Sequence, residues 1–228
     1  VEVKGQFPRQ RDKQFNSRDL VEKAVERESE LDNWAPLMMG VDPARFGDDE
    51  TVIRFRQGRN SRIIPAIKLK GRDNMEVTNE CAHLINKYNP DAVCIDAGNG
   101  TGIIDRLREL KYKVHEVWFG ARSPKEEYSD MRTYIWAEMR DWLGGAMLDN
   151  DQDLIDDLTA PEYKFVQTDK IKLESKEELK KKGFASPDDA DALACTFAVK
   201  VASSHLKTSR MANSRRAVAK DLDYDMFG

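Results

Sequence analysis

A change in the spacing of apolar residues constrains the fold of this chain more than any other feature. Before residue 73, short apolar or alternating runs that are typical of β-strands follow one another with short connections. Three such runs predict an antiparallel meander over residues 37–42 (LMMGVD), 50–57 (ETVIRFRQ) and 62–69 (RIIPAIKL). Because Pro65 has no backbone N–H to donate, we expect the third strand to lie at the edge of the sheet.

From residue 73 onwards, helical spacing alternates with strand-like runs. Apolar positions over 73–88 predict a helix, and the run 91–96 (DAVCID) is typical of a strand that is buried on both faces. A short helix over 100–110 and a strand over 113–119 complete a strand–helix–strand unit, which we expect to be parallel and right-handed. The chain is therefore predicted to be an α/β protein with a mixed sheet.

The second half of the chain adds further helices and a pair of strands. We expect the longest amphipathic helix over 128–143, a short helix over 153–158, two short strands within 162–175, a charged helix over 175–183 and a last element from Pro187 to about Ser203.

The length of 228 residues allows one large domain, or one domain with an appendage. Residues 1–36 form a polar lead-in with a short helix from about Asp19 to Glu28, for which Ser17 is a candidate N-cap. We expect the ordered domain over 37–203. The tail, 204–228, is first basic and then acidic and apolar, and we expect it to be flexible.

Composition disfavours several classes of protein and site. The formal net charge of -4 is not that of a typical nucleic-acid-binding protein, so any basic surface must be local. The three cysteines fit no CxxC pattern and indicate reduced thiols rather than a zinc site or a disulfide framework. The three histidines lie far apart in the sequence, which disfavours histidine-based chemistry. The sequence shows no run long enough for a membrane span and no signal peptide.

Two aspartates end strands that should lie at the centre of the sheet. Asp42 ends the run LMMGVD and Asp96 ends the run AVCID, and a glycine-bearing loop follows each of them. Ligands of open α/β sheets collect at the carboxyl ends of strands. If the two strands are neighbours, their carboxylates lie close together and call for a cation such as Mg²⁺. The alternative is that each aspartate only caps the next turn.

A cluster of three further aspartates lies in the stretch 185–194, ASPDDADALA. Ser186 has the properties of an N-cap, Pro187 suits the first helical position, and Asp188 and Asp189 suit the positive end of the helix dipole. A helix start therefore explains these four residues.

Asp191 is not explained in this way. Its neighbours at helical spacing are Ala194, Cys195 and Ala198, which form a small apolar face that should pack tightly on the sheet. An ionised carboxylate on such a face needs a partner. A metal ion shared with Asp42 and Asp96 would supply one.

These acids lie in segments that resemble the C-terminal nuclease domain of the large terminase subunit of tailed bacteriophages. The resemblance covers about residues 5–200. The matching segments occur in the family's order and are GQFP, GVDPARFGDDETVI, VCIDAGNGTGIIDRL, RTYIWAEMRDWL and KIKLESKEELKKKGFASPDDADALACTFA.

The resemblance implies an RNase H-like fold, with a mixed five-stranded sheet (an antiparallel meander followed by parallel strands) and helices on both faces. It implies an acidic triad, Asp42, Asp96 and Asp191, that binds two Mg²⁺ or Mn²⁺ ions. The implied activity is an endonuclease that cleaves concatemeric double-stranded viral DNA during genome packaging, by two-metal-ion hydrolysis of a phosphodiester.

The resemblance also implies partners and a location. Family members carry an ATPase motor, but this chain has no G-x-x-x-x-G-K-[ST] motif, so residues 1–36 would be the connector to a motor that is absent here. The implied partners are double-stranded DNA, the motor domain, the portal and the small terminase subunit. The implied location is the bacterial host cytoplasm, at the procapsid portal, and we expect the isolated domain to be a monomer.

A lysine-rich segment, 164–182, precedes Asp191. Such a segment is usually a solvated face, and the alternative is contact with DNA phosphates. Lys176 is our first candidate beside the scissile phosphate. Further candidates for contact with the DNA backbone are Lys172, Lys180, Arg122 and Arg132.

Several residues keep two interpretations. Arg132 is either a DNA contact or the ion-pair partner of an acid such as Asp130 or Glu126. The loop acids Asp48, Asp49 and Glu50 are turn residues, or have an outer-shell or DNA-gating role. We expect Asp105 to be a solvated helical acid and GNGTG to be a close-packed turn rather than a phosphate loop.

Other functions remain as alternatives. A junction resolvase or transposase of the RNase H-like class would use the same acids, and GQFP and SPDDADALA argue against it. An actin-like phosphate-binding ATPase would need a second copy of the fold. A non-catalytic adaptor that binds DNA or the portal would not need all three acids.

Overall fold

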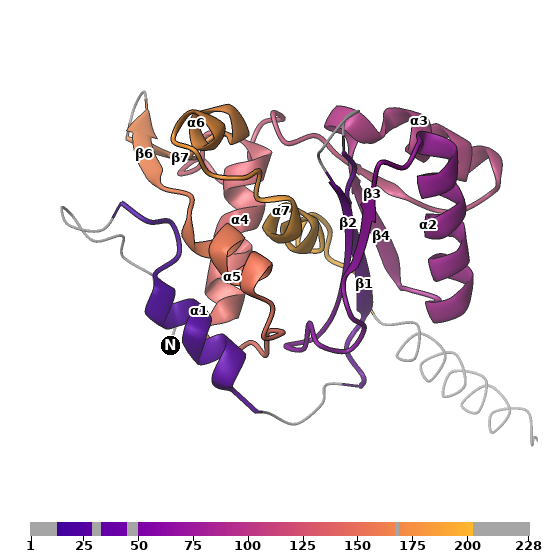
Figure 1. Ribbon diagram of the computed structural model, residues 1–228, viewed down its shortest axis with the longest axis horizontal. Coiled ribbons are helices and arrows are strands. Elements are labelled where there is room, and N and C mark those ends of the chain that lie inside the picture. Colours follow the sequence, from indigo (N-terminus) through magenta and orange to yellow (C-terminus); the bar gives the residue numbers. More distant parts are fainter. Residues whose placement is uncertain (1–12, 29–32, 45–49, 167–168, 203–228) are drawn as a thin grey trace, which may run out of the picture.

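A mixed five-stranded sheet forms the centre of the computed structural model, which describes residues 13–28, 33–44, 50–166 and 169–202. The strand order is β3-β2-β1-β4-β5. The first three strands are antiparallel neighbours, and β4 and β5 run parallel to β1 (Figure 1). The predicted meander and the parallel unit are therefore confirmed. The strands are β1 (Leu37–Asp42), β2 (Glu50–Gln57), β3 (Ile67–Lys70), β4 (Ala92–Asp96) and β5 (His115–Val117).

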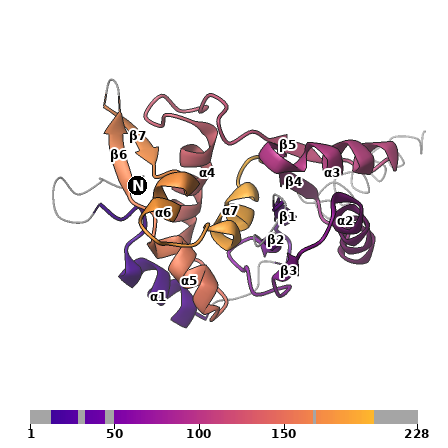
Figure 2. The same cartoon turned by 45° about the horizontal axis from the view of Figure 1, so that its top comes forward.

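Helices cover both faces of this sheet, as the resemblance implied. One face carries α2 (Asn74–Tyr88) and α3 (Ala97–Glu109). On the other face, α7 (Asp188–Cys195) lies directly on the strands, and a second layer packs behind it (Figures 1 and 2). That layer holds α1 (Arg18–Glu26), α4 (Met131–Leu143), α5 (Gln152–Thr159), the hairpin β6 (Tyr163–Val166) and β7 (Lys170–Leu173), and α6 (Lys176–Lys181).

Some boundaries differ from the expected ones. β3 is the edge strand, as predicted, but it begins at Ile67, so Pro65 precedes it. The helix expected over 128–143 is α4, which begins only at Met131 because Asp130 is its N-cap, and the longest described helix is α2 with 15 residues. The last helix ends at Cys195 rather than near Ser203. The guanidinium of Arg56 donates to the carbonyl oxygen of Thr196 at 2.9 Å, so this oxygen is bonded outside the helix at the point where α7 ends.

The lead-in contributes to the core of the body. The predicted helix is α1, and the Ser17 side chain caps it by accepting from the Leu20 N–H. Val21, Ala24 and Phe15 are buried in the same apolar cluster as residues of α4 and α5. The division at residue 36 stays a prediction, and the tail lies outside the described residues apart from the stretch that ends at 202. No helix in the described part of the chain is long and apolar enough to cross a membrane.

Small residues set the distance between α7 and the sheet. A Cβ atom added to Gly40, at the centre of β1, would lie 2.0 Å from the carbonyl oxygen of Ala192. The helix backbone therefore rests almost directly on the strand backbone. The alanines of α7 that are buried here are Ala190, Ala192 and Ala194. This contact fixes the height of every side chain that α7 turns toward the sheet.

We predict that Gly40→Ala destabilises the protein, because the new methyl group must push α7 away from β1. The expected loss is about 1–3 kcal/mol in the free energy of unfolding, as for other overpacked cores. Thermal unfolding measures it. Gly120→Ala is the matched control, since no atom lies within 4 Å of its added Cβ. Equal melting temperatures for both variants would contradict the close contact.

Candidate active site

Asp42 and Asp96 end the two parallel strands at the centre of the sheet. Val41 pairs with Ile95 in the register, so the two aspartates that follow come side by side at the carboxyl edge. Both are buried, at 1% and 6% exposure. Because alternate residues of a strand share a face, Asp42 faces α7, as Gly40 does. The condition for a shared site, that the two strands are neighbours, is therefore met.

One ammonium group joins Asp42 to the acids of α7. Lys176 Nζ lies 2.7 Å from Asp42 Oδ2 and 3.2 Å from Asp191 Oδ2. The same nitrogen lies 3.0 Å from Asp188 Oδ1. Lys176 is the first residue of α6, whose start is fixed by a capping box on Ser175. The structure thus brings the first lysine candidate and two of the three triad acids into direct contact.

The electrostatics of the acids follow from burial and from these cations. Burial raises the pKa of Asp42 well above its usual value, and Lys176 offsets only part of that effect. Burial also raises the pKa of Asp96, against a hydrogen bond from the Gly98 N–H. For Asp191, burial acts in the same direction, but Arg132 and Lys176 together bring its pKa below the usual value. Two acids of the triad therefore lack sufficient positive charge, and the third has it.

The site is partly prepared for a metal ion. Asp42 Oδ1 is buried and has no hydrogen-bond partner among the described residues. A buried carboxylate oxygen without a donor fits a cation, because such an atom is costly to leave unpaired. However, no three His, Cys, Asp or Glu side chains of the described ranges form a cluster that could hold an ion as they stand. The ammonium of Lys176 lies between the carboxylates of Asp42 and Asp191.

Asp96 also caps the turn that follows it, which was the alternative interpretation of this residue. Its Oδ1 accepts from the Gly98 N–H at 3.0 Å and so caps α3. The predicted close-packed turn follows at once, since a Cβ on Gly100 would lie 2.9 Å from Pro43 Cγ. The segment GNGTG therefore packs as the first turn of α3. Capping uses one carboxylate oxygen of Asp96, which is compatible with a further role for the other.

Arg132 is placed differently from the DNA contact that we expected. Its guanidinium is buried and donates to Asp191, from Nε to Oδ1 at 2.9 Å and from Nη2 to Oδ2 at 3.2 Å. Its Nη1 donates to the carbonyl oxygen of Glu174. The ion-pair interpretation was correct in kind, but the partner is Asp191 rather than Asp130 or Glu126. Asp130 instead caps α4 by accepting from the Thr133 N–H.

The start of α7 also differs from the expected cap. Pro187 is the N-cap residue and makes no side-chain cap, while the Ser186 hydroxyl donates to Asp188 Oδ1 at 2.6 Å. Asp188 and Asp189 are ion-paired rather than simply placed at the helix dipole. A helix start therefore does not suffice to explain them.

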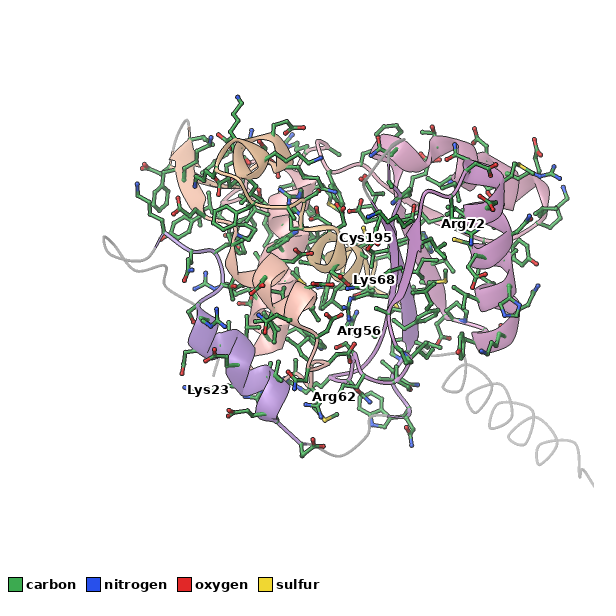
Figure 3. All side chains as sticks on the ribbon, viewed as in Figure 1. Lys23, Arg56, Arg62, Lys68, Arg72 and Cys195 are labelled. Carbon is green, nitrogen blue, oxygen red and sulfur yellow. The ribbon has the colours of Figure 1, made fainter. Side chains whose placement is uncertain are left out.

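Asp189 belongs to a buried ionic network that was not predicted from the sequence. Arg54 on β2 donates from Nε to Asp189 Oδ1 at 2.6 Å. Its two terminal nitrogens reach Asp149 and Asp151 at 2.9 and 2.8 Å. Lys68 on β3 lies 2.7 Å from Asp189 Oδ2, and Figure 3 shows it between the sheet and the helices on the α7 face. A signal existed, since Arg54 is a charge in the middle of a strand, with the apolar residues Ile53 and Phe55 on either side of it in the sequence.

Asp157 on α5 supplies the cap that α7 lacks. Its Oδ2 accepts from the Asp189 N–H at 3.0 Å. Burial, together with the nearby charges of Asp189, Asp188 and Asp191, raises the pKa of Asp157 to about 8. No sequence signal marked this residue, because the contact joins positions 32 residues apart.

A groove of about 410 Å³ lies at the N-terminal end of α7, lined also by residues of β2, β3 and α5. Acids dominate its lining, with Glu50, Asp153, Asp156, Asp157, Asp188 and Asp189 against the lysines Lys70 and Lys180. Such a lining does not suit a phosphate backbone. Glu50 therefore lies at the start of β2 beside this groove, while Asp48 and Asp49 lie outside the described residues.

The remaining candidates lie at or near the surface. Arg122 and Lys180 are exposed, and Lys172 is half-buried on β7, where it pairs directly with Lys164 of β6. Their contact with DNA stays a prediction. Asp105 is exposed on α3, as expected. The three cysteines are buried free thiols.

Solved structures show the same architecture, although no protein-family model and no curated protein sequence matches this chain. The nuclease domain of the large terminase subunit of bacterial virus Sf6 superposes with a TM-score of 0.68 at 18% identity, over 82% of this chain and 99% of that one. The large terminase nuclease from thermophilic phage G20c gives 0.59 at 15% identity, over 82% and 100%. The fold is that of the nuclease domains of phage large terminase subunits. The RNase H-like fold that we expected is thus confirmed.

Some of these terminase nuclease structures contain divalent metal ions. A lysine-to-alanine mutant of the Sf6 domain was solved with calcium, and it superposes with a TM-score of 0.69 at 19% identity, over 80% of this chain and 97% of that one. The same mutant was also solved with manganese, and the G20c nuclease with magnesium.

We predict that Asp157→Asn makes the stability of the protein less dependent on pH. Folding raises the pKa of this carboxyl from 3.8 to about 8, so the folded state holds a proton that the unfolded chain releases. Its contribution to stability is therefore complete below about pH 4 and is lost as the pH rises toward 8. At pH 8 the variant should be more stable than the wild type by about 2 kcal/mol, or roughly 4–8 °C in melting temperature, and by less at pH 5.

Thermal unfolding at several pH values measures this difference. Asp156→Asn is the matched control, because its side chain is exposed on the same helix. A difference between Asp157→Asn and the wild type that grows toward acid pH would refute the assignment.

Proposed function

We propose that this chain is a metal-dependent endonuclease that cuts double-stranded viral DNA during genome packaging. One observation carries the proposal: Asp42 and Asp96 end adjacent parallel strands, and Asp191 shares a single ammonium with Asp42 across the same edge. Buried acids with a raised pKa at the carboxyl ends of core strands are typical of a cation site in this kind of sheet. Support for the substrate comes from the terminase nuclease domains that share the fold.

The three acids would hold two Mg²⁺ or Mn²⁺ ions. Asp42 is the best donor, because its Oδ1 is buried without a hydrogen-bond partner in the described part of the chain. Asp96 and Asp191 would complete the ligand set from β4 and α7. When bound, such ions supply Lewis acidity, which activates water and neutralises charge on the phosphate.

The chain's own residues prepare the site in other ways. Burial of Asp42 and Asp96 excludes bulk water, which strengthens every charge interaction at the edge of the sheet. Lys176 neutralises Asp42 and Asp191 when no divalent ion is present, and it can turn to a DNA phosphate when one is. Its side chain is 25% exposed, so it has access to solvent and to a ligand.

Partners and location follow from the same proposal. The residues that would contact the DNA backbone are Lys172, Lys180 and Arg122, whose side chains are exposed or half-buried. We further propose that the domain works with a terminase ATPase, a portal and a small terminase subunit, in the cytoplasm of a bacterial host at the procapsid.

We predict that the protein nicks and linearises supercoiled plasmid in Mn²⁺ or Mg²⁺ and not in EDTA. Asp42→Asn and Asp96→Asn should each lower the rate roughly 100-fold or more, because each removes a charge that acts at the reacting phosphate. Agarose-gel cleavage measures this. The matched control is Asp105→Asn, an exposed acid on α3, which should cut at the wild-type rate. Unchanged cleavage by Asp42→Asn, or by Asp191→Ala, would contradict the triad.

We predict that Lys176→Ala lowers the stability of the protein and strengthens its response to divalent ions, because the ammonium of Lys176 is removed from the site. Without divalent ions, the variant should lose on the order of 2 kcal/mol of stability, because buried carboxylates lose their partner. Ca²⁺ should raise the melting temperature of the variant more than that of the wild type, because the ion no longer competes with the ammonium.

Thermal-shift titrations with CaCl₂ measure both effects. Lys181→Ala is the matched control, an exposed lysine on the same helix. Equal calcium responses in the two variants would show that Lys176 does not share its position with a divalent ion.

A further inference from the structure

Asp191 differs from the other two acids of the site in having both oxygens compensated. Its Oδ1 accepts from Arg132 Nε at 2.9 Å and from Trp136 Nε1 at 2.7 Å. Its Oδ2 accepts from Arg132 Nη2 at 3.2 Å and lies 3.2 Å from Lys176 Nζ. Asp42, by contrast, has Lys176 on one oxygen and no described partner on the other. The acids of the site are therefore unequal ligands.

Arg132 is held in place independently of Asp191. Its Nη1 donates to the carbonyl oxygen of Glu174 at 2.7 Å, directly before the segment that carries Lys176. Its guanidinium carbon lies 5.5 Å from the Trp136 ring centroid and 6.0 Å from that of Phe119. The side chain is 9% exposed, whereas that of Lys176 is 25% exposed. Lys176 is therefore the more accessible of the two cations, and Arg132 is the more enclosed.

We propose that Arg132 is a positioning residue that turns Asp191 Oδ1 away from the site and leaves Oδ2 as its single metal ligand. The proposal rests on the proposed nuclease function. The fixed positive charge of Arg132 beside Asp191 weakens the binding of a divalent ion there, because like charges at short range repel in a buried site. Arg132 acts on Asp42 and Asp96 only from a greater distance, without a hydrogen bond or ion pair to either in the described part of the chain, so an ion at those two acids would bind more tightly.

Unequal ions have a consequence for the timing of cleavage. A weakly held ion needs further oxygen ligands, and a DNA phosphate supplies them. The pair of ions is then complete only with DNA in place. Arg132 thus links full occupancy of the site to the presence of substrate.

The test separates ion affinity from cleavage rate. Arg132→Gln keeps a donor for Asp191 and removes the charge, and Arg132→Lys keeps the charge and removes the fork. Ca²⁺ and Mn²⁺ are titrated by calorimetry without DNA, and plasmid cleavage is measured separately in Mn²⁺. For Arg132→Gln we expect the weaker ion to bind roughly tenfold more tightly and the cleavage rate to fall at least about tenfold. For Arg132→Lys we expect slow cleavage with the affinity of the wild type.

The chain offers a closely matched control, Arg56→Gln. Arg56 is also held against an indole, with its guanidinium carbon 6.0 Å from the Trp142 ring centroid, and it bonds to Thr196 at the far end of α7. Figure 3 labels it between the sheet and the helices on the α7 face. Its loss should lower stability but leave ion affinity unchanged.

A second readout locates the weaker ion. Trp136 Nε1 donates to Asp191 Oδ1, so an ion at Asp191 should change the emission of this indole. The change is obtained by subtracting a titration of Trp136→Phe. Weaker-ion binding that leaves this emission unaltered would overturn the placement at Asp191.

The outcomes distinguish this inference from the proposed function. Arg132→Gln with lowered affinity and lowered rate together, or with wild-type affinity, overturns the role of Arg132 while the nuclease stands. A wild-type protein that neither binds divalent ions nor cuts DNA overturns the proposed function, and the inference falls with it. Tighter binding with slower cutting supports both.

Discussion

The enclosure of three acids on one short helix, Asp189 and Asp191 buried and Asp188 half-buried, is the interaction on which the structure depends. α7 lies between the sheet and a second layer of helices, so its carboxylates cannot rely on solvent. Each has a cation from a different element: Asp189 has Arg54 of β2, Asp188 has Lys176 of α6, and Asp191 has Arg132 of α4. Removing one partner of a buried pair leaves an uncompensated charge, which typically costs about 3–5 kcal/mol. These pairs hold the two layers in register around α7.

Much of the fold could be predicted from local patterns. The change from strand to helical spacing correctly gave the meander and the parallel strand–helix–strand unit, because pattern and pairing of consecutive strands are local properties. The pairing of β1 with β4 joins distant segments and did not follow from the spacing. Asp42 and Asp96 could be chosen as candidate site residues in the same way, because each is an acid at the end of an apolar run in the sequence. The role of Asp191 as an acid in need of a partner was also visible from its small apolar neighbours, although its burial among protein cations was not.

What could not be predicted depends on contacts between distant parts of the chain. Arg132 and Asp191 are 59 positions apart, and Arg54 and Asp189 are 135 apart. No periodicity specifies which cation meets which acid, because that choice is made when the layers pack. The prediction of the α7 cap was wrong for the same reason. Local preference favoured Ser186, but the N–H of Asp189 donates to Asp157 on another helix.

Lys176 lies on the six-residue helix α6 at the outside of the second layer, whereas Arg132 lies on α4 inside it. The protein therefore has one removable and one permanent counter-charge at the same group of carboxylates. The carboxylates of such a site are partly compensated by two protein cations before any metal arrives, so the chain can complete its folding on its own charges. Under the proposed function, an ion would enter this site by exchange with the ammonium of Lys176, and it would not be the nucleus around which the polypeptide must assemble.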